Sequence, residues 1–237
     1  MRIAASADVH ARAGDEARIA AMFASAKEDA DVLVLGGDLT DHGRSEEMEA
    51  LVRGLHEVGL PVVAVLGNHD HESGGEKVLF RILASSGIHV LDRRRPTVTI
   101  DGIGFAGVKG FGGGFGARLV RAFGEEIQKA FVAASVVEAE ALRAGLMSLD
   151  TPRKVAVLHY APVAATVEGE PTEIWPFLGT SRLEQALDEG GAHLAVHGHA
   201  HHGSPHGKTT RGVPVHNVSI PVLRATGSQK AYVVMDV

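Results

Sequence analysis

The chain has 237 residues, 45% of them hydrophobic, which is enough for one domain with a sizeable core. We therefore expect a single domain over residues 1–237. The formal net charge of -6 argues against an overall basic field that could hold a long polynucleotide. Because the sequence has no cysteine, disulfides, thiolate metal sites and cysteine nucleophiles are excluded. Any metal must be bound by histidine, carboxylate or amide groups, and 14 histidines are available.

The N-terminal residues lack the features of a targeting segment. Met1 leads into a short strand pattern without a charged leader, and no apolar run reaches the roughly 18 residues that a transmembrane helix needs. We expect a soluble, cytoplasmic protein without a membrane partner.

The first third of the chain alternates short apolar runs with amphipathic helical patterns. Strands are predicted over residues 2–7, 31–37 and 61–66, and helices over residues 15–29, 45–58 and 76–86. Asp15 is expected to cap the first helix. Three successive β-loop-α units favour a parallel sheet.

The rest of the chain is less regular. Strand patterns cover residues 88–91, 97–100, 104–108, 153–158, 192–196, 213–220 and 231–237. A helical pattern runs from about Ala117 to Met147 with a break near Gly124, and Ser181 with Glu184 forms a capping box for another helix. The glycine-rich residues 110–116 lack the Gly-Lys-Ser/Thr ending of a P-loop, so a mobile connecting loop is expected.

Side chains that can bind metals follow five of the predicted strands. Asp8 and His10 are two residues apart, so in an extended backbone both point to the same side and can bind one ion. Asn68 and His69 are adjacent, point to opposite sides, and are assigned different tasks, as a ligand and a catalyst. The other members are Asp38, His159, His199 and His201. Each motif alone is common in turns, but five such clusters after five strands favour a metal site.

In chain order these clusters read Asp-Xaa-His, Gly-Asp, Gly-Asn-His-Asp, His and Gly-His-Xaa-His, from Asp8 to His201. On this pattern the sequence resembles the calcineurin-like metallophosphoesterase superfamily. The resemblance implies an α/β fold, a four-layer αββα sandwich with two mixed β-sheets, and a dinuclear metal site at the strand ends. By motif, one metal would be bound by Asp8, His10, Asp38 and His201, and the other by Asp38, Asn68, His159 and His199. His69 would face the departing oxygen, and Asp70 would orient its imidazole.

Two divalent ions about 3.5 to 4 Å apart can share a hydroxide that attacks a phosphate in line. Oxygen and imidazole ligands suit Mn²⁺, Fe or Zn²⁺, and we expect Mn²⁺ first. The predicted function is a phosphodiesterase that hydrolyses small phosphodiesters such as cyclic nucleotides. A nuclease or phosphomonoesterase of the same superfamily, or a non-catalytic metal-binding scaffold, are the alternatives.

The sequence also bears on the substrate. The protein phosphatases of this superfamily carry two arginines that bind a phosphate dianion, but the matching positions here read Asp41-His42-Gly43 and Leu66-Gly67. A diester carries one charge fewer and needs less cationic help, so this sequence is more similar to the small bacterial phosphodiesterase-like members. The only dense basic run, residues 93–95, is short for a nuclease.

Three residues keep two interpretations each. His197 has the same strand parity as His199, so spacing alone also allows His197 as a ligand, and only the Gly-His-Xaa-His frame selects the later pair. Trp175 and Phe177 either stack on a base or aryl leaving group, or pack the domain.

Overall fold

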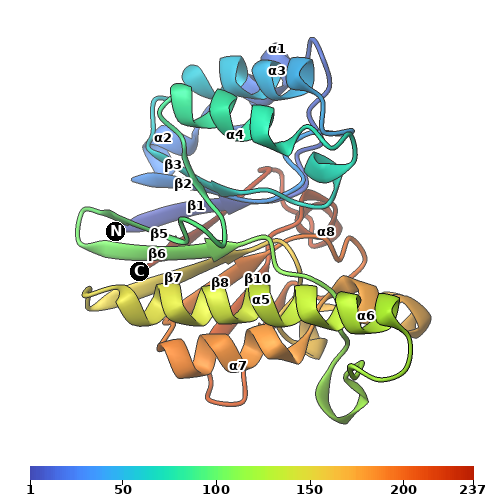
Figure 1. The fold of residues 1–237 in the computed structure, drawn as a ribbon. Helices are drawn as coiled ribbons and strands as arrows, with labels where there is room; N and C mark the ends of the chain where they lie inside the picture. Colours follow the sequence, from blue (N-terminus) through green and yellow to red (C-terminus); the bar gives the residue numbers. More distant parts are fainter.

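Two β-sheets lie face to face between two groups of helices in the computed structural model, which describes residues 1–237 (Figure 1). The first sheet has the order β11-β1-β2-β3-β4, with strands Val233–Asp236, Arg2–Ser6, Val32–Gly36, Val62–Val65 and His89–Leu91. The second has the order β5-β6-β7-β8-β10-β9, with strands Thr97–Ile100, Ile103–Val108, Arg153–Leu158, Leu194–His197, Pro214–Asn217 and His206–Lys208. Only the edge strands β11, β5 and β9 are antiparallel to their neighbours. The predicted four-layer α/β sandwich with two mixed sheets is confirmed.

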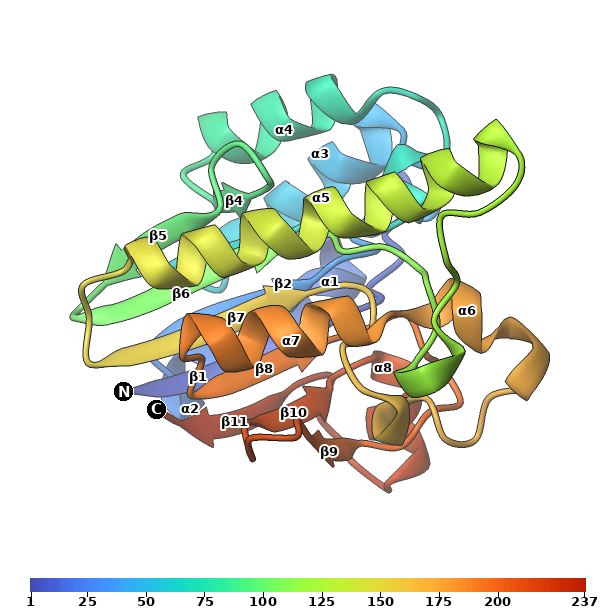
Figure 2. The ribbon, with the colours of Figure 1, turned by 60° about the horizontal axis from the view of Figure 1, so that its bottom comes forward.

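The helices form the two outer layers. They are α1 (Glu16–Met22), α2 (Ala26–Asp29), α3 (Ser45–His56), α4 (Glu76–Ser85), α5 (Glu126–Ser148), α6 (Trp175–Leu178), α7 (Ser181–Gly190) and α8 (Ile220–Ala225). Short 3₁₀ turns occur at η1 (His69–His71), η2 (Gly116–Arg118), η3 (Ala164–Thr166) and η4 (Thr172–Ile174). Helices α1, α3 and α4 cover the first sheet, and α5 and α7 cover the second, as both views show (Figures 1 and 2). No helix combines the length and apolar character needed to cross a bilayer.

The strands are apolar on both faces because both faces are buried. In β2, Leu33 packs toward the helices of the first layer, whereas Val32 and Val34 belong to the cluster between the sheets. From the second sheet, Phe105 and Val157 enter the same inner cluster. This double burial explains why the parallel strands appear in the sequence as continuous apolar runs.

Three predicted element boundaries are wrong. The helix predicted over residues 15–29 is divided into α1 and α2, because the chain turns where Phe23 stacks on Tyr232 and Ser25 bonds to the Tyr232 hydroxyl. The helical pattern breaks at Gly124 as predicted, since its φ of 80° is incompatible with a helix, but the segment predicted to be helical from about Ala117 up to this break contains only the 3₁₀ turn η2. The strand predicted over residues 213–220 ends at Asn217, and α8 follows at once.

Two predicted helix caps are also absent. Asp15 makes no cap bond, since its carboxylate accepts from the guanidinium of Arg18 instead. Helix α7 begins after Thr180, whose hydroxyl accepts from a helix amide. Ser181 accepts from a loop amide and Glu184 from a distant threonine, so the capping box does not form.

The glycine-rich segment is packed, contrary to the prediction of a mobile loop. Gly112, Gly113 and Gly114 are buried. The amide of Gly113 donates to the Pro176 carbonyl, and that of Gly114 donates to the Gly179 carbonyl at 2.9 Å. These bonds tie the segment to the connection between α6 and α7, so it acts as part of the framework.

Candidate metal centre

The fold brings all the sequence-predicted site residues to one edge of the sandwich. They follow the carboxyl ends of β1, β2, β3, β7 and β8, which are parallel within their sheets. Because the two sheets face each other, ligands from both meet at this edge. The residues brought together are Asp8, His10, Asp38, Asn68, His69, His159, His199 and His201.

The backbone at four of these residues lies in the left-handed region. The φ angles are 61° at Asp8, 45° at His10, 46° at Asp38 and 70° at His199. The chain is therefore sharply turned at these positions, and the extended backbone predicted for Asp8 and His10 is wrong. Non-glycine residues with positive φ are rare and concentrate at functional sites, where the surroundings hold them in place.

Two motif glycines are required by close approach to a carboxylate. A Cβ atom at Gly67 would overlap the carboxylate and amide of Asp38, and one at Gly198 would overlap the carboxylate of Asp8. Any side chain at either position would displace a candidate ligand. The glycine of Gly-Asn-His-Asp and that of Gly-His-Xaa-His therefore make room for candidate metal ligands that follow other strands.

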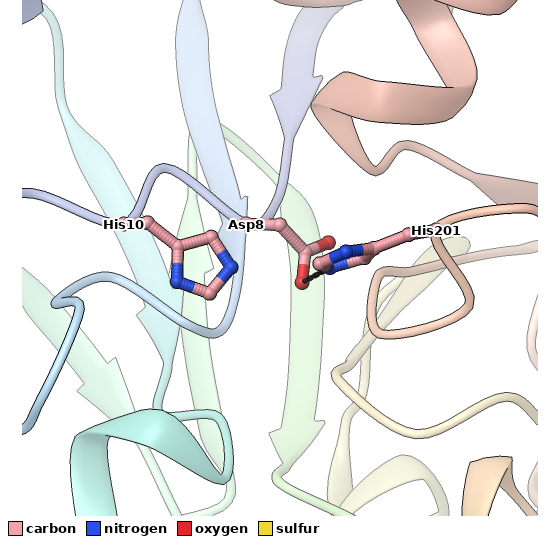
Figure 3. Close-up of side chains that lie close together, drawn as sticks. All are labelled: Asp8, His10 and His201. Carbon is pink, nitrogen blue, oxygen red and sulfur yellow. Dashed lines mark hydrogen bonds and ion pairs between the residues drawn. The ribbon is translucent and has the colours of Figure 1, made fainter.

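The first candidate ligand group is Asp8, His10 and His201, whose ligand atoms all lie within 4.8 Å of one another. Figure 3 shows Asp8 between the two imidazoles, with Nε2 of His201 3.0 Å from its carboxylate. The backbone amide of His199 also donates to this carboxylate, at 3.1 Å. Nε2 of His10 faces the site, 4.0 Å from the Asp38 carboxylate, whereas its Nδ1 lies 3.5 Å from the Asp41 carboxylate.

The second candidate group is Asp38, His159 and His199, with Asn68 beside it. Nε2 of His159 lies 2.9 Å from the Asn68 amide oxygen and 3.4 Å from the Asp38 carboxylate. Nδ1 of His159 donates to the Gly36 carbonyl at 2.9 Å, so the Nε2 lone pair is directed to the site. In the same way Nε2 of His199 is bonded to a backbone carbonyl, at 3.2 Å, which leaves its Nδ1 free.

Asp38 also belongs to a third group, with His10 and His69. Nδ1 of His69 donates to the Asp41 carbonyl at 2.7 Å, and its Nε2 lies 4.0 Å from the Asp38 carboxylate. His10 and Asp38 each belong to two of the three groups, and Asp38 is the only carboxylate that does so.

The hydrogen bonds of Asp70 differ from the prediction that it orients His69. Asp70 is fully buried, and its carboxylate accepts from the amides of Leu39, Thr40 and Gly67 and from the Thr40 hydroxyl. All its acceptor positions are used in joining the loop after β2 to the loop after β3. The sequence could not reveal this, because those donors are 31 and 30 residues away for Leu39 and Thr40.

The electrostatics of the site fit a divalent cation. Burial, together with the neighbouring carboxylates of Asp8 and Asp70, raises the pKa of Asp38. Burial lowers the pKa of His159 well below its usual range, which keeps this imidazole neutral and able to bind a metal. Two buried carboxylates surrounded by imidazoles form a donor set suited to Mn²⁺, Fe or Zn²⁺.

Three further residues have defined positions. His197 is fully buried, with Nδ1 2.8 Å from the Gly198 carbonyl and Nε2 2.8 Å from the Thr166 hydroxyl, so both nitrogens face protein groups rather than the ligand clusters. Trp175 packs in a small core cluster and donates to a backbone carbonyl. The Phe177 side chain is 60% exposed, and its carbonyl is the acceptor for His199.

Sequence reasoning missed Arg18. Its guanidinium donates to the carbonyls of Val9 and His10, both at 3.2 Å, and to Asp15. It thereby holds the sharply turned loop that carries Asp8 and His10. The i, i+3 spacing of Asp15 and Arg18 was the only local signal for this contact.

The chain belongs to the calcineurin-like phosphoesterase family, whose model matches residues 1–203. Family membership and the His/Asp groups together support a metal-dependent phosphoester hydrolase. A search of functionally curated proteins finds no significant match.

Solved structures show the same fold at low sequence identity. A Thermus thermophilus protein has a TM-score of 0.57 and 16% identity, over 93% of this chain and 90% of that chain. GAP50, the anchor in the inner membrane complex of Plasmodium, has a TM-score of 0.54 and 10% identity, over 93% and 72%. A putative 5'-nucleotidase from Staphylococcus aureus has a TM-score of 0.56 and 13% identity, over 91% of this chain but 48% of that chain.

Proposed function

We propose that the protein is a two-metal phosphodiesterase that hydrolyses small phosphodiesters. The observation that carries this proposal is the position of Asp38, which, like His10, lies in two of the three candidate ligand groups and is the only carboxylate that does so. A carboxylate in that position can bridge two cations. Because both sheets contribute ligands, we also propose that residues 1–237 act as one catalytic domain.

The two ligand sets are those that the family resemblance implies, and each contains one of the groups in the structure together with one further residue, Asp38 or Asn68. Asp8, His10, Asp38 and His201 would bind one ion, and Asp38, Asn68, His159 and His199 the other. Two bound divalent ions would lower the pKa of a water molecule and neutralise phosphate charge. We propose Mn²⁺ as the preferred metal, because the set has no thiolate and combines carboxylate, amide and imidazole donors.

His69 is the proposed catalytic residue. Its ring is 38% exposed, whereas the ring of His159, on the other side of Asp38, is closed to solvent. The bond from Nδ1 to the Asp41 carbonyl fixes the orientation of the ring. Nε2 is then free to donate a proton to the oxygen that leaves the phosphate.

The cations near the first ligand group favour a diester over a monoester. Arg12 is paired with Asp41 at 2.7 Å, and Arg18 is occupied by Asp15 and two carbonyls. Neither guanidinium is free to bind a phosphate dianion, which agrees with the absence of the two phosphatase arginines. Arg12, Arg18 and Arg224 line a cavity that also includes Asp8 and His10, and Arg224 has no ion pair. The assay therefore compares a diester directly with a monoester.

The decisive experiment is a panel of metals and substrates. The purified protein is loaded with Mn²⁺, Fe²⁺ or Zn²⁺ and assayed on an aryl diester, an aryl monoester, cyclic nucleotides and single-stranded DNA. The proposal expects Mn²⁺-dependent cleavage of the small diesters. A preference for the monoester or for DNA would overturn it, and so would activity that is unchanged by chelation.

His69→Ala tests the catalytic assignment and separates an enzyme from a scaffold. We expect a loss of about 10²-fold or more in kcat, the usual range for a general acid. His202→Ala is the matched control, since this histidine is exposed and adjacent to the ligand His201. Diester hydrolysis that survives His69→Ala would show that the assignment is wrong. A cytoplasmic location stays a prediction.

A further inference from the structure

A cavity of about 330 Å³ adjoins the candidate metal centre. Its wall includes Leu66 and His71, which flank the site residues Asn68 and His69 in the loop after β3. Lys109, directly after β6, forms another part of the wall. The carbonyl of Lys109 accepts from the amide of His159 at 3.1 Å, so both walls are continuous with the proposed second ligand set.

Four cationic side chains line this space, which we name the cationic cavity: Lys77, Arg93, Arg94 and Lys109. None of them has a carboxylate oxygen within the 4.0 Å that defines an ion pair. Arg93 and Arg94 belong to the basic run at positions 93–95, and the proposed catalytic mechanism assigns no role to this run.

The acidic residues of the same wall are engaged elsewhere. Glu138 accepts from the amide of Gly110 at 3.0 Å, and Asp92 accepts from the amides of Arg94 and Arg95, both at 2.8 Å. Glu76 lies in the first turn of α4, where the helix dipole favours a negative charge. Each carboxylate thus has a backbone or helix partner, and although Glu138 attracts Lys109 and Arg93 electrostatically, it forms no ion pair with either cation.

Lys109 is the cation nearest the metal centre. Its ammonium makes one hydrogen bond, to the adjacent Gly110 carbonyl at 3.0 Å, and lies 4.8 Å from the ring centroids of both Phe111 and Tyr160. Aromatic faces can hold a half-buried cation in this way without a carboxylate. The Tyr160 ring also packs on His199, with 4.4 Å between centroids, so a single ring separates the ammonium from a candidate ligand.

We propose that the cationic cavity binds a second phosphate group carried by the phosphodiester substrate. This inference rests on the proposed diesterase function and narrows its substrate class. Two guanidinium and two ammonium groups offer more hydrogen-bond donors than the two oxygens of a carboxylate can accept from. They suit the three oxygens and double charge of a terminal phosphate. The volume falls in the range of small-ligand pockets, which begins at roughly 300 Å³.

The test uses pairs of aryl diesters with the same nitrophenyl leaving group. One member carries a plain alkyl ester, and the other carries the same alkyl chain ending in a phosphate, with chains of two to six carbon atoms. The Mn²⁺-loaded enzyme should prefer one of the phosphorylated substrates by about tenfold or more in kcat/KM, as expected for charge-assisted hydrogen bonds. The absence of any such preference would overturn the proposal.

Variants then locate the preference. In Arg93→Ala/Arg94→Ala the ratio of kcat/KM values for the two substrates should fall about tenfold, and Lys109→Met should lower it as well. Arg95→Ala is the matched control, because this neighbouring arginine does not line the cavity. Both arginines are exposed, so the double variant is expected to fold even if Lys109→Met does not. An unchanged ratio in the double variant would sink the inference.

A binding measurement keeps this inference separate from the diesterase proposal. If neither diester is cleaved, the proposed function fails, and the cavity is judged by calorimetry with alkane bisphosphonates and the matching monophosphonates. Tighter binding of a bisphosphonate that is lost in Arg93→Ala/Arg94→Ala supports an anion subsite. The anion subsite is overturned if the wild type binds the bisphosphonates and the monophosphonates equally tightly. It is also overturned if the wild type and Arg93→Ala/Arg94→Ala bind the bisphosphonate equally tightly.

Discussion

Asp70→Asn distinguishes a structural role for Asp70 from the catalytic role that its motif suggests. The carboxylate of Asp70 is fully buried and accepts four hydrogen bonds, two at each oxygen. Oδ1 accepts from the amide and hydroxyl of Thr40, and Oδ2 accepts from the amides of Leu39 and Gly67. These bonds fix the loops that carry Asp38 and Asn68.

An asparagine amide oxygen can accept from only one of these two pairs of donors. When the NH₂ group takes the place of Oδ1, the Thr40 hydroxyl can turn to accept from it, so the Thr40 amide is the donor that is left unsatisfied, at a cost of about 1–3 kcal/mol. The expected destabilisation is therefore about 1–3 kcal/mol. Because burial also raises the pKa of Asp70, part of the cost of burying its charge is relieved in the variant, and the lower half of that range is expected. This is a measurable part of the total stability of a domain, which is typically about 5–15 kcal/mol.

The assay is urea unfolding at pH 7, followed by circular dichroism on chelator-treated protein so that bound metal does not contribute. Asp101→Asn is the control, since Asp101 is exposed in a hairpin turn with φ of 46°, which asparagine tolerates. Its free energy of unfolding should stay within about 0.5 kcal/mol of the wild type. If Asp70→Asn unfolds like the wild type but loses activity, the catalytic role is correct and the structural reasoning is refuted.

Four further substitutions test the candidate metal centre and the buried histidine next to it. Asp38→Asn should lower the content of both metals in elemental analysis, whereas His10→Ala should chiefly lower one; two full ions in Asp38→Asn would exclude a bridge. Gly67→Ala should displace Asp38 and so weaken metal binding by an order of magnitude or more, read by titration with Mn²⁺. Burial lowers the pKa of His197 to about 4, below the unfolded value of 6.5. The contribution of the neutral His197 to the free energy of unfolding is therefore fully present above pH 6.5 and decreases as the pH drops toward 4. His197→Gln should remove up to about 3 kcal/mol of that dependence without loss of bound metal, and an unchanged pH profile would contradict it.

The position of the candidate site could be predicted because it depends on local patterns. Apolar runs identified the parallel strands, and polar residues directly after them had to gather where the strands end. The glycines of these motifs were visible as turn formers, but their function is steric. The absence of a side chain at Gly67 leaves space for the carboxylate of Asp38, which follows another strand. Residue spacing within one segment cannot predict a contact between two segments.

The two wrong predictions of helix caps share a physical cause, which is competition from other hydrogen-bond partners. Asp15 was assigned as a cap from its neighbours, but the guanidinium of Arg18 takes its carboxylate and uses the remaining donors to hold the loop of His10. Ser181 likewise bonds to Gly116, 65 residues away. A local propensity of about 1 kcal/mol is readily outweighed by a tertiary hydrogen bond to a charged group.

The strained backbone of the candidate ligands is held by hydrogen bonds that continue the sheet beyond its strands. After β1 and β2 end, the amides of Asp8, His10 and Ala11 donate in turn to the carbonyls of Gly37, Asp38 and Leu39, at 2.9 to 3.0 Å. Each left-handed residue costs on the order of 1–3 kcal/mol, so the turned conformation persists only where such bonds overdetermine it. Because these bonds come from the protein and not from a ligand, the ligand positions are largely built before any ion binds. The sharp turns therefore serve preorganisation, since they direct side chains of adjacent parallel strands toward a common centre.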